Sequence, residues 1–342
     1  MKGKISVLGG GSWGTALALS LAKKGHDIDI WMRDKKQCED MNYTRENIKY
    51  LPGVVIPNNI RATNDLEKAI SNKEILISAV PTQSVRDNIK NMKQYINKNQ
   101  IIVNVSKGIE IGSLCRISEV VKEELPDNEY VVLSGPSHAE EVARDLPTTL
   151  VVASDKRKVA EYIQDIFMTP KLRVYTNPDV VGVEMGGALK NIIALGAGIS
   201  DGLGYGDNTK SALMTRGITE IGRLGCKMGA REVTFAGLSG IGDLIVTCTS
   251  IHSRNRRAGI LIGEGKNLDE VSTTIGMVVE GTKTTKAAYE LSKKYNVEMP
   301  ITQEIYNVLY SGSDVKNSVV NLMMRNKKYE MEDVYKGIEI DW

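Results

Sequence analysis

The segment ISVLGGGSWG at residues 5–14 decides the expected fold, because a short β-branched run leads directly into a glycine-rich turn. Gly9, Gly11 and Gly14 fit the spacing G-x-G-x-x-G, and residues typical of a helix follow to about Lys24. In this pattern the first glycine permits a tight turn, the second lets the backbone approach a pyrophosphate, and the third lets the helix pack on the strand. The alternative is a glycine turn without a ligand, but strand, turn, helix and second strand fall within one unit of about thirty residues. The segment therefore predicts a dinucleotide-binding site at the start of that helix.

Outward from this unit, β-branched runs alternate with helical segments through the first half of the chain. The predicted strands are residues 5–8, 28–31, 75–80, 101–105, 130–133, 149–153 and 173–175. Strands that alternate with helices favour a parallel, doubly wound sheet. After Tyr175 the pattern changes to helical spacing, beginning with the long apolar segment at residues 182–199. We therefore expect a Rossmann-type α/β domain at residues 1–180 and an all-α domain at residues 181–342.

The composition disfavours several classes of protein. The 44 Lys and Arg residues nearly balance 42 Asp and Glu residues, and a formal charge of +2 argues against binding to nucleic acid or an anionic membrane. The four cysteines lack the spacing of a disulfide framework or a zinc site, so we expect no metal. The apolar run after Met1 is too short for a signal peptide, and no segment reaches the apolar length of a membrane helix. We expect a soluble cytoplasmic protein with a small-molecule substrate, while the oligomeric state, including a homodimer, stays open.

Cofactor preference should be set where the second strand ends, at Arg33 and Asp34. Asp34 could hydrogen-bond both ribose hydroxyls of NAD, whereas Arg33 could pair with the 2′-phosphate of NADP and stack on adenine. Either residue could equally be a solvated loop charge. We expect NADP(H) to be used and NAD(H) to be tolerated.

A nicotinamide cofactor implies hydride transfer, and hydride addition to a carbonyl requires a proton donor. Lys190 lies within the apolar segment, where burial would lower the pKa of its ammonium, and Asn191 is a second polar group beside it. The alternative is that Lys190 extends from a helix edge into water. The histidines are weaker candidates: His26 is expected in a surface turn, and His138 and His252 in polar loops, of which the first could line a cleft.

Two polar segments follow predicted strands, at the edge where ligands bind in an open α/β sheet. Lys107 follows the strand at residues 101–105, and Gly135 and Ser137 follow the strand at residues 130–133. The alternatives are a loop lysine and a simple turn.

The second half of the chain adds a carboxylate and a cluster of cations. Asp243 lies among small and apolar residues, and Thr247 would share its face if the segment is helical. Asp243 could instead cap a helix. Residues 253–257, SRNRR, open a further helix, and a helix N-terminus that carries Arg254 suits a phosphate. For the last two arginines of this cluster we expect a solvated surface.

Seven segments together closely resemble the NAD(P)-dependent glycerol-3-phosphate dehydrogenases of the bacterial type. In chain order they are GGGSWGTALA, NVSKG, SGPSHAEE, GGALKNIIALGAGISDG, GLSGIGDLIVTC, SRNRR and VVEGTKT. The last four are far more specific than the glycine turn, which alone supports only nucleotide binding. The resemblance implies reversible reduction of dihydroxyacetone phosphate to sn-glycerol 3-phosphate, the head-group precursor of glycerophospholipids, with NADP(H) or NAD(H) as cofactor.

The resemblance also implies roles for individual residues. Lys190 would be the proton donor or acceptor at the substrate oxygen, and the groups around the reacting end would be Lys107, Asn191, Asp243 and Thr247. The other implied substrate contacts are Gly135, Ser137 and, at the phosphate, Ser253, Arg254 and Asn255. Besides the glycines of the turn, the implied cofactor contacts are Ser12, Trp13, Arg33, Lys107, Ala139, Arg254, Val278 and Glu280.

Two other functions compete with this one. A related two-domain dehydrogenase would act on a hydroxy or keto acid, and a noncatalytic NAD(P) sensor would use the fold as a redox switch. A carboxylate substrate needs only one cationic side chain to bind it, so either Arg254 or Lys107 would be redundant. A sensor has no need of a buried lysine and a carboxylate in its second domain, which Lys190 and Asp243 supply.

Overall fold

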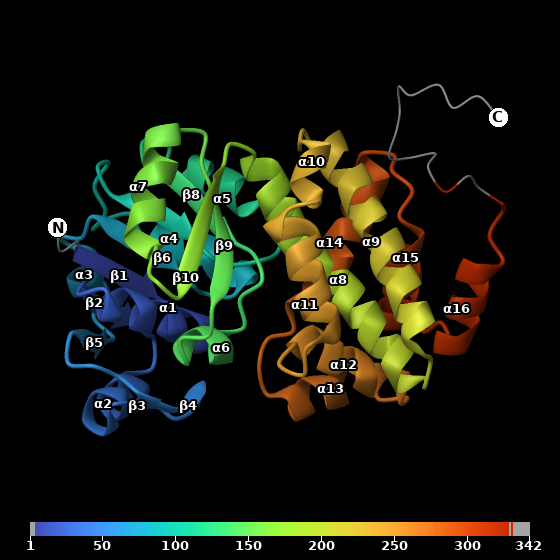
Figure 1. The fold of residues 1–342 in the computed structure, drawn as a ribbon, viewed down its shortest axis with the longest axis horizontal. Helices are drawn as coiled ribbons and strands as arrows, with labels where there is room; N and C mark the ends of the chain where they lie inside the picture. The colour runs from blue at the N-terminus through green and yellow to red at the C-terminus, as the bar shows by residue number, and fades with distance from the viewer. Residues whose placement is uncertain (1–3, 328–329, 331–342) are drawn as a thin grey trace.

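The computed structural model describes residues 4–327 and 330, and it contains an α/β domain beside a helical domain (Figure 1). The α/β domain is built on an eight-stranded sheet with the order β10-β9-β8-β7-β6-β1-β2-β5. The strands are β1 (Lys4–Leu8), β2 (Asp27–Trp31), β5 (Ile60–Thr63), β6 (Ile75–Ser78), β7 (Ile101–Asn104), β8 (Tyr130–Ser134), β9 (Thr148–Ala153) and β10 (Leu172–Asn177). All seven strands expected from the sequence are present, which confirms the Rossmann-type fold of this half.

The expectation of a wholly parallel sheet is wrong at one edge. β8 and β9 pair antiparallel, with Val132 opposite Ala153, whereas β10 is parallel to β9. The last two strands therefore run against the other six. The connection from β8 to β9 contains only the five-residue helix α6 (Ala139–Ala143), which is too short to cross a face of the sheet and return parallel.

Three strands have no counterpart in the sequence prediction. β5 is a four-residue strand at the sheet edge. β3 (Glu46–Asn47) and β4 (Leu51–Val55) form an antiparallel pair outside the main sheet, which we call the 46–55 hairpin. β4 contains Pro52 and Gly53, residues that are uncommon inside strands, so its sequence gives no strand signal.

Helices cover both faces of the sheet, as a doubly wound fold requires. One face packs against α1 (Ser12–Lys23), α2 (Lys35–Thr44), α6 and α7 (Arg157–Phe167). The other packs against α3 (Leu66–Ile70), α4 (Val85–Met92) and α5 (Ile117–Glu124). Successive strand residues divide between these two cores, so Val7 belongs to the first and Leu8 to the second.

The helical domain is organised around α8 (Val180–Gly202), which is buried along nearly its whole length. The other helices are α9 (Asp207–Lys227), α10 (Glu232–Phe235), α11 (Asp243–Thr249), α12 (Arg254–Gly263), α13 (Leu268–Ile275), α14 (Glu280–Lys294), α15 (Pro300–Tyr310) and α16 (Val315–Met323). Contrary to the sequence estimate, α8 is long and apolar enough to cross a membrane, but 94% of its most apolar window is buried inside the protein. Enclosure by α9, α11, α12 and α14 accounts for that composition.

Two pairs of glycines let α8 and α12 approach closely. A β-carbon on Gly198 would lie 2.0 Å from the carbonyl oxygen of Arg256, and one on Gly259 would lie 2.1 Å from a carbonyl oxygen of α8. One turn later, Gly202 and Gly263 meet in the same way. Residues spaced by four share one face of a helix, so the two backbones touch along a continuous line.

The two domains join along the antiparallel edge of the sheet. Val132, Val151 and Ala153 of β8 and β9 pack against Val180 and Val183 of α8. Because α8 begins where the sheet ends, we propose the domain boundary between residues 180 and 181. The predicted helical domain extends to residue 342, and its final segment lies outside the described residues.

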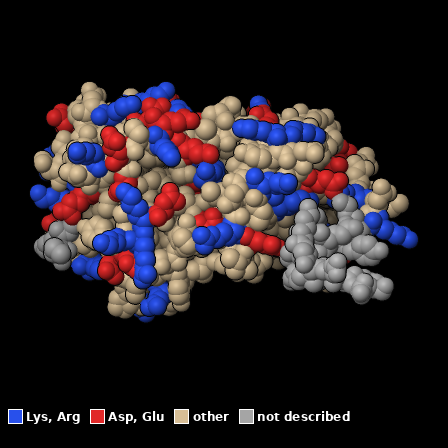
Figure 2. Space-filling view, turned by 90° about the horizontal axis from the view of Figure 1, so that it is seen from above, with Lys and Arg blue, Asp and Glu red and all other residues tan. Residues whose placement is uncertain are grey.

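The charged side chains are intermixed rather than segregated. On the face presented in Figure 2, Lys and Arg lie among Asp and Glu over both domains. This face therefore carries no extended field of one sign, in keeping with a formal charge of +2.

Replacing Gly198 with alanine should destabilise the protein, because the added methyl group would force α12 away from α8. We expect a loss of about 1–3 kcal/mol in the free energy of unfolding, measured by urea or thermal unfolding. The control is Gly222→Ala in α9, where the nearest atom would lie 3.6 Å from the β-carbon. This control should be neutral or stabilising, because alanine favours a helix by about 1 kcal/mol over glycine. Equal losses in the two variants would contradict the close-packing argument.

Candidate functional site

A cleft of about 1220 Å³ lies between the two domains and is lined by residues of both. The sequence-predicted residues on its wall are Gly9, Gly11, Ser12, Trp13, Arg33, Lys107, Ser137, Ala139, Lys190, Asn191, Asp243, Thr247, Ser253, Arg254, Asn255, Val278 and Glu280. Gly14 and Gly135 lie behind this wall, and both act through backbone contacts described below. Segments from both halves of the chain therefore meet at one cavity.

The glycine turn has the shape expected of a dinucleotide site. Gly9 has a φ of +119°, and a β-carbon there would lie 2.6 Å from the carbonyl oxygen of Ala79. A β-carbon on Gly14 would lie 2.1 Å from the carbonyl oxygen of Gly9, so α1 packs directly on the turn. Nothing lies within 4 Å of the β-carbon position of Gly11, which leaves room for a pyrophosphate. No side chain caps the N-terminus of α1, so its first N–H groups suit an anion.

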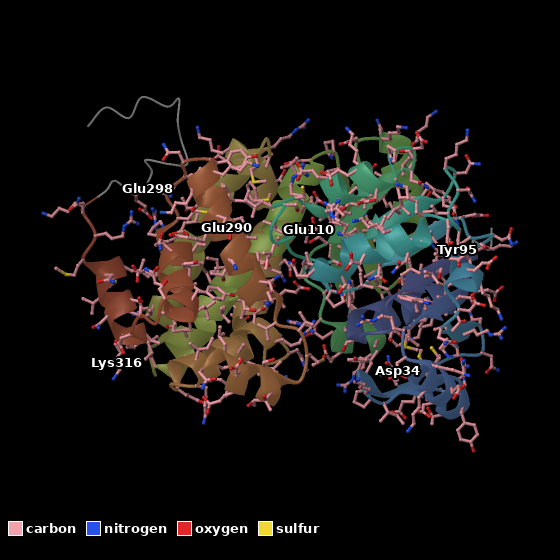
Figure 3. All side chains as sticks on the ribbon, turned by 180° about the vertical axis from the view of Figure 1, so that it is seen from behind. Asp34, Tyr95, Glu110, Glu290, Glu298 and Lys316 are labelled. Carbon is pink, nitrogen blue, oxygen red and sulfur yellow. The ribbon has the colours of Figure 1, made fainter. Side chains whose placement is uncertain are left out.

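The ribose end of the expected cofactor site contains Arg33 and Asp34. The Asp34 carboxylate accepts a hydrogen bond from the N–H of Gln37 at 3.2 Å, so it caps α2 in the N-terminal domain (Figure 3). The Arg33 side chain is exposed and lines the cleft. Asp34 is also exposed and lines the cleft, and its cap uses only one carboxylate oxygen, so both side chains can meet a ligand here.

One buried carboxylate joins two lysines in the cleft. The Lys190 ammonium donates to Asp243 Oδ1 at 2.5 Å and to Thr247 Oγ1 at 2.6 Å. The Lys107 ammonium donates to Asp243 Oδ2 at 2.7 Å and to the carbonyl oxygen of Gly135 at 2.8 Å. Lys107 follows β7 and Lys190 lies in α8, so Asp243 links the two domains.

These contacts decide two alternatives that the sequence leaves open. Lys190 is only 5% exposed, so it does not extend into water. Asp243 is the first residue of α11, whose cap is Gly242, and its carboxylate contacts the lysines instead of the helix end. Thr247 shares its helix face, as expected, and donates to the carbonyl oxygen of Asp243 at 2.6 Å.

Burial and neighbouring charges change the proton affinity of these groups. Burial lowers the pKa of Lys190 from 10.5 to about 8, Lys107 adds to this effect, and Asp243 opposes it. Burial alone would raise the pKa of Asp243, but the two ammonium groups hold it below its ordinary value. A carboxylate that stays charged therefore lies beside an amine that gains or loses a proton near pH 8.

Glycines place Asp243 against α8. A five-residue π-helical turn, Leu238–Gly242, precedes α11, and Gly240 inside it has a φ of −93° and a ψ of −106°. A β-carbon on Gly186 of α8 would lie 2.6 Å from the carbonyl oxygen of Ser239 in this turn, so glycine lets the two backbones touch. The dihedral angles of Gly240 are not helical, so the chain kinks there directly before α11 and brings Asp243 against α8.

A second set of polar side chains lies at the N-terminus of α12. Ser253 caps this helix by accepting a hydrogen bond from a first-turn N–H at 3.2 Å, and Arg254 is its first residue. Asn255 Nδ2 donates to Asn191 Oδ1 at 2.8 Å, and Asn255 Oδ1 accepts from the N–H of Gly281 at 2.8 Å. An arginine, a helix N-terminus and an oriented amide can together bind a phosphate.

Several residues differ from the sequence expectations. Arg256 does not lie on a solvated surface, because its Nε donates to Asp201 Oδ2 at 2.7 Å. His26 is 4% exposed instead of lying in a surface turn. For His138 the sequence leaves a cleft and a solvent position open, and the structure places it on the cleft wall with His252, with ring centroids 5.8 Å apart. The position of His138 directly after Ser137 was the available signal for its place in the cleft.

The 46–55 hairpin also reaches the cleft, which no sequence motif indicates. Lys49 and Tyr50 line the wall, and Ser12 Oγ donates to the carbonyl oxygen of Tyr50 at 2.6 Å. Within residues 4–327 and 330, no group of three or more His, Cys, Asp or Glu side chains is placed to hold a metal ion.

One wall carries a glycine turn of the dinucleotide-binding type, and the other carries a titratable lysine beside a helix end suited to an anion. Together these features indicate a two-domain NAD(P)-linked dehydrogenase. Comparison with known protein families supports this class. The family model described as "NAD-dependent glycerol-3-phosphate dehydrogenase N-terminus" matches residues 4–160, and the model of the corresponding C-terminus matches residues 179–320. This chain belongs to the NAD-dependent glycerol-3-phosphate dehydrogenase family.

Individual relatives cover nearly the whole chain. The glycerol-3-phosphate dehydrogenase (NAD(P)+) of Thermoanaerobacter sp. (strain X514) is 58% identical over 331 residues, which are 97% of this chain and 100% of that protein. That of Desulfitobacterium hafniense (strain Y51) is 57% identical over 334 residues, 97% of this chain and 94% of that protein. The crystal structure of glycerol-3-phosphate dehydrogenase from Coxiella burnetii has a TM-score of 0.92 at 38% identity and covers 95% of this chain and 99% of that one. A ketopantoate reductase from Ralstonia eutropha, at 13% identity and a TM-score of 0.61, shares the fold alone.

Replacing Asp243 with asparagine should impair both stability and turnover, because the buried ammonium of Lys190 and the half-buried ammonium of Lys107 would lose their shared counter-charge. We expect a loss of about 3–5 kcal/mol in unfolding free energy and of roughly 100-fold in turnover, measured by thermal unfolding and steady-state rates. The control is Asp201→Asn, because Asp201 also pairs with two cations, Lys210 and Arg256, each at 2.7 Å, but does not line the cleft. Equal losses of turnover at a temperature where both variants are folded would leave Asp243 without a specific role.

Proposed function

We propose that this protein catalyses the reversible reduction of dihydroxyacetone phosphate to sn-glycerol 3-phosphate with NADPH or NADH, which supplies the glycerophospholipid precursor. The observation that carries the proposal is the Lys190–Asp243–Lys107 centre in a cleft that also contains the glycine turn and the N-terminus of α12. The substrate has one carbonyl and one phosphate, and the cleft presents a group suited to each end. The relatives described above are named glycerol-3-phosphate dehydrogenases, after the product of this reduction.

Lys190 is the proposed proton donor in the reduction. The bound cofactor supplies a hydride to the carbonyl carbon of the substrate. The Lys190 ammonium donates a proton to the oxygen on which negative charge develops, and in the reverse direction the neutral amine accepts it. Asp243 and Thr247 occupy two of the three N–H groups of this ammonium, which directs the third toward the substrate oxygen.

Lys107 has a different proposed role, because its ammonium is fully engaged. It donates to Asp243 Oδ2, to the carbonyl oxygen of Gly135 and, at 3.3 Å, to Ser137 Oγ. These contacts use all three N–H groups, so Lys107 acts through its charge on the developing oxyanion instead of by proton transfer.

Arg254 and the N-terminus of α12 form the proposed phosphate clamp. Its guanidinium lies on the cleft wall and donates to the carbonyl oxygen of Val278 at 3.0 Å, which leaves further N–H groups for a phosphate. Ser253 and Asn255 would complete the clamp from the same helix end. Asn191 holds the Asn255 amide and donates to the carbonyl oxygen of Lys107 at 3.2 Å, so the clamp is tied to the lysine centre.

The proposed cofactor site extends from the glycine turn across the cleft. Its contacts with the dinucleotide would come from Gly9, Gly11, Ser12, Trp13, Arg33, Lys107, Ala139, Arg254, Val278 and Glu280, while Gly14 supports the turn from behind. Arg33 is the proposed reader of the ribose, because its guanidinium can pair with a 2′-phosphate, which favours NADPH. Asp34 lines the same wall and caps α2 through one oxygen, so NADH would also be accepted.

The test of this function is the oxidation of NADPH and, separately, of NADH by dihydroxyacetone phosphate, with unphosphorylated dihydroxyacetone as the control substrate. Rapid oxidation that requires the phosphate is expected, with the lower KM for NADPH. With NADPH saturating, so that any loss of the proposed Arg254 contact to the cofactor does not limit the rate, Arg254→Ala should raise the KM for dihydroxyacetone phosphate by about 10- to 100-fold. The rate with dihydroxyacetone should stay nearly unchanged. Absence of oxidation in a sample that binds NADPH would refute the substrate, and equal losses with both substrates would refute the clamp.

The pH dependence of the reduction tests Lys190. Its protonated form is the donor, so kcat/KM for reduction should be constant below pH 8 and fall about tenfold per unit above it, while oxidation shows the opposite dependence. Lys190→Met should remove this inflection and lower kcat by about 100-fold or more, with NADPH affinity nearly unchanged. The control is Lys210→Met, because Lys210 pairs with Asp201 outside the cleft wall and should not affect turnover. Near wild-type turnover in Lys190→Met would exclude it as the proton donor.

Two further expectations from the sequence stay predictions. They are a cytoplasmic location and, as one possible assembly, a homodimer. Fractionation of cells and sedimentation of the purified protein would test them.

A further inference from the structure

A side chain from outside the glycine turn holds part of that turn in place. Asn47, in β3, is 2% exposed, and its Nδ2 donates to the carbonyl oxygen of Gly10 at 2.9 Å and to Thr15 Oγ1 at 2.8 Å. Both amide hydrogens of this asparagine are therefore used on the dinucleotide-binding unit. Ser12 Oγ donates in the other direction, to the carbonyl oxygen of Tyr50 at 2.6 Å. The 46–55 hairpin thus contacts the turn and the start of α1 at several points.

The bond to Gly10 sets the direction of the next backbone N–H. In a trans peptide the carbonyl and the N–H point in opposite directions, so anchoring the Gly10 carbonyl aims the Gly11 N–H the other way. Gly11 lies on the cleft wall, with open space at its β-carbon position. Glycine on both sides makes this peptide unit easy to rotate, and a rotated unit would present its carbonyl oxygen to the cleft.

We propose that Asn47 is a positioning residue for the dinucleotide: its amide holds the Gly10–Gly11 peptide with the N–H directed at the pyrophosphate. Asn47 does not itself line the cleft, so it acts through the turn. An N–H that is already oriented binds an anion without the entropy loss of ordering the peptide on binding. This inference rests on the proposed use of NADPH or NADH.

The 46–55 hairpin has other contacts that hold its ends together without Asn47. Arg45 Nε donates to the carbonyl oxygen of Ile56 at 3.0 Å, and the N–H of Ile56 donates to the carbonyl oxygen of Arg45 at 2.8 Å. Glu46 Oε1 accepts from the N–H of Gly53 at 2.6 Å. In a variant of Asn47 the hairpin should therefore still form, while the hydrogen bond to the Gly10 carbonyl oxygen is lost.

The test compares Asn47→Leu with a matched asparagine at the other end of α1. Asn59 Nδ2 also donates two hydrogen bonds, to the carbonyl oxygens of Ala22 and His26, both at 2.8 Å. NADPH affinity is measured by fluorescence titration, and thermal unfolding is recorded for each protein. Asn47→Leu should weaken NADPH binding by on the order of tenfold, whereas Asn59→Leu should leave it unchanged, although both lower the unfolding temperature.

A second ligand and a second variant separate positioning from general damage. The probe 2′-AMP carries adenine, ribose and the 2′-phosphate but no pyrophosphate, so Asn47→Leu should bind it as the wild type does. In steady state the KM for NADPH should rise by roughly tenfold, with kcat and the KM for dihydroxyacetone phosphate unchanged. Asn47→Asp retains the shape but cannot donate to Gly10, so it should weaken NADPH binding at least as much as Asn47→Leu.

Three outcomes would overturn the proposal. They are unchanged NADPH affinity in Asn47→Leu, an equal loss for NADPH and 2′-AMP, and an equal loss of NADPH affinity in Asn59→Leu. A wild-type protein that binds neither NADPH nor NADH would instead refute the proposed function, which distinguishes the two failures.

Discussion

The rest of the site depends on the pairing of the Asp243 carboxylate with two lysines. It is 1% exposed, and its two oxygens receive ammonium groups from different domains, Lys107 from the loop after β7 and Lys190 from α8. A buried carboxylate is stable only when it is paired, and two neighbouring cations, one buried and one half-buried, are stable together only with a counter-charge between them. Neutralisation of charge therefore joins the walls of the cleft, in addition to the apolar packing between α8 and the antiparallel edge of the sheet.

The elements of the fold were predictable where local sequence carries the signal. β-Branched runs bounded by glycine or polar residues identify the strands, and the glycine turn identifies the βαβ unit. The direction of β9 was not predictable, because it depends on whether the segment after β8 crosses a face of the sheet. No residue pattern in that segment indicates such a crossing. The 46–55 hairpin was missed because Pro52 and Gly53 argue against a strand, and because its stability comes from Arg45 contacts made across the hairpin.

The sequence predicted which residues belong to the site better than it predicted their contacts with one another. Lys190 is conspicuous as a charge within an apolar helix, but its partner Asp243 lies 53 residues away, and only the family resemblance placed the two together. The preference between NADPH and NADH stays a prediction, because Arg33 and Asp34 both line the cleft and Asp34 caps α2 through only one carboxylate oxygen. Arg256 was predicted to be a surface cation, because its partner, Asp201, belongs to another helix and is not visible in the local sequence. Such tertiary pairings have no counterpart in the periodicity of a single segment.

The glycine contacts between α8 and α12 have a consequence for the cleft wall that these helices contribute. Lys190 precedes Gly198 on α8 by about two turns, and Arg254 precedes Gly259 on α12 by about one and a half. Where two main chains touch, no change of side chain can bring the helices closer, so the backbone itself sets the minimum spacing between the helix that carries Lys190 and the helix that carries Arg254. Four residues that have no side chains and do not line the cleft therefore hold together the two helices that carry these side chains to the cleft wall.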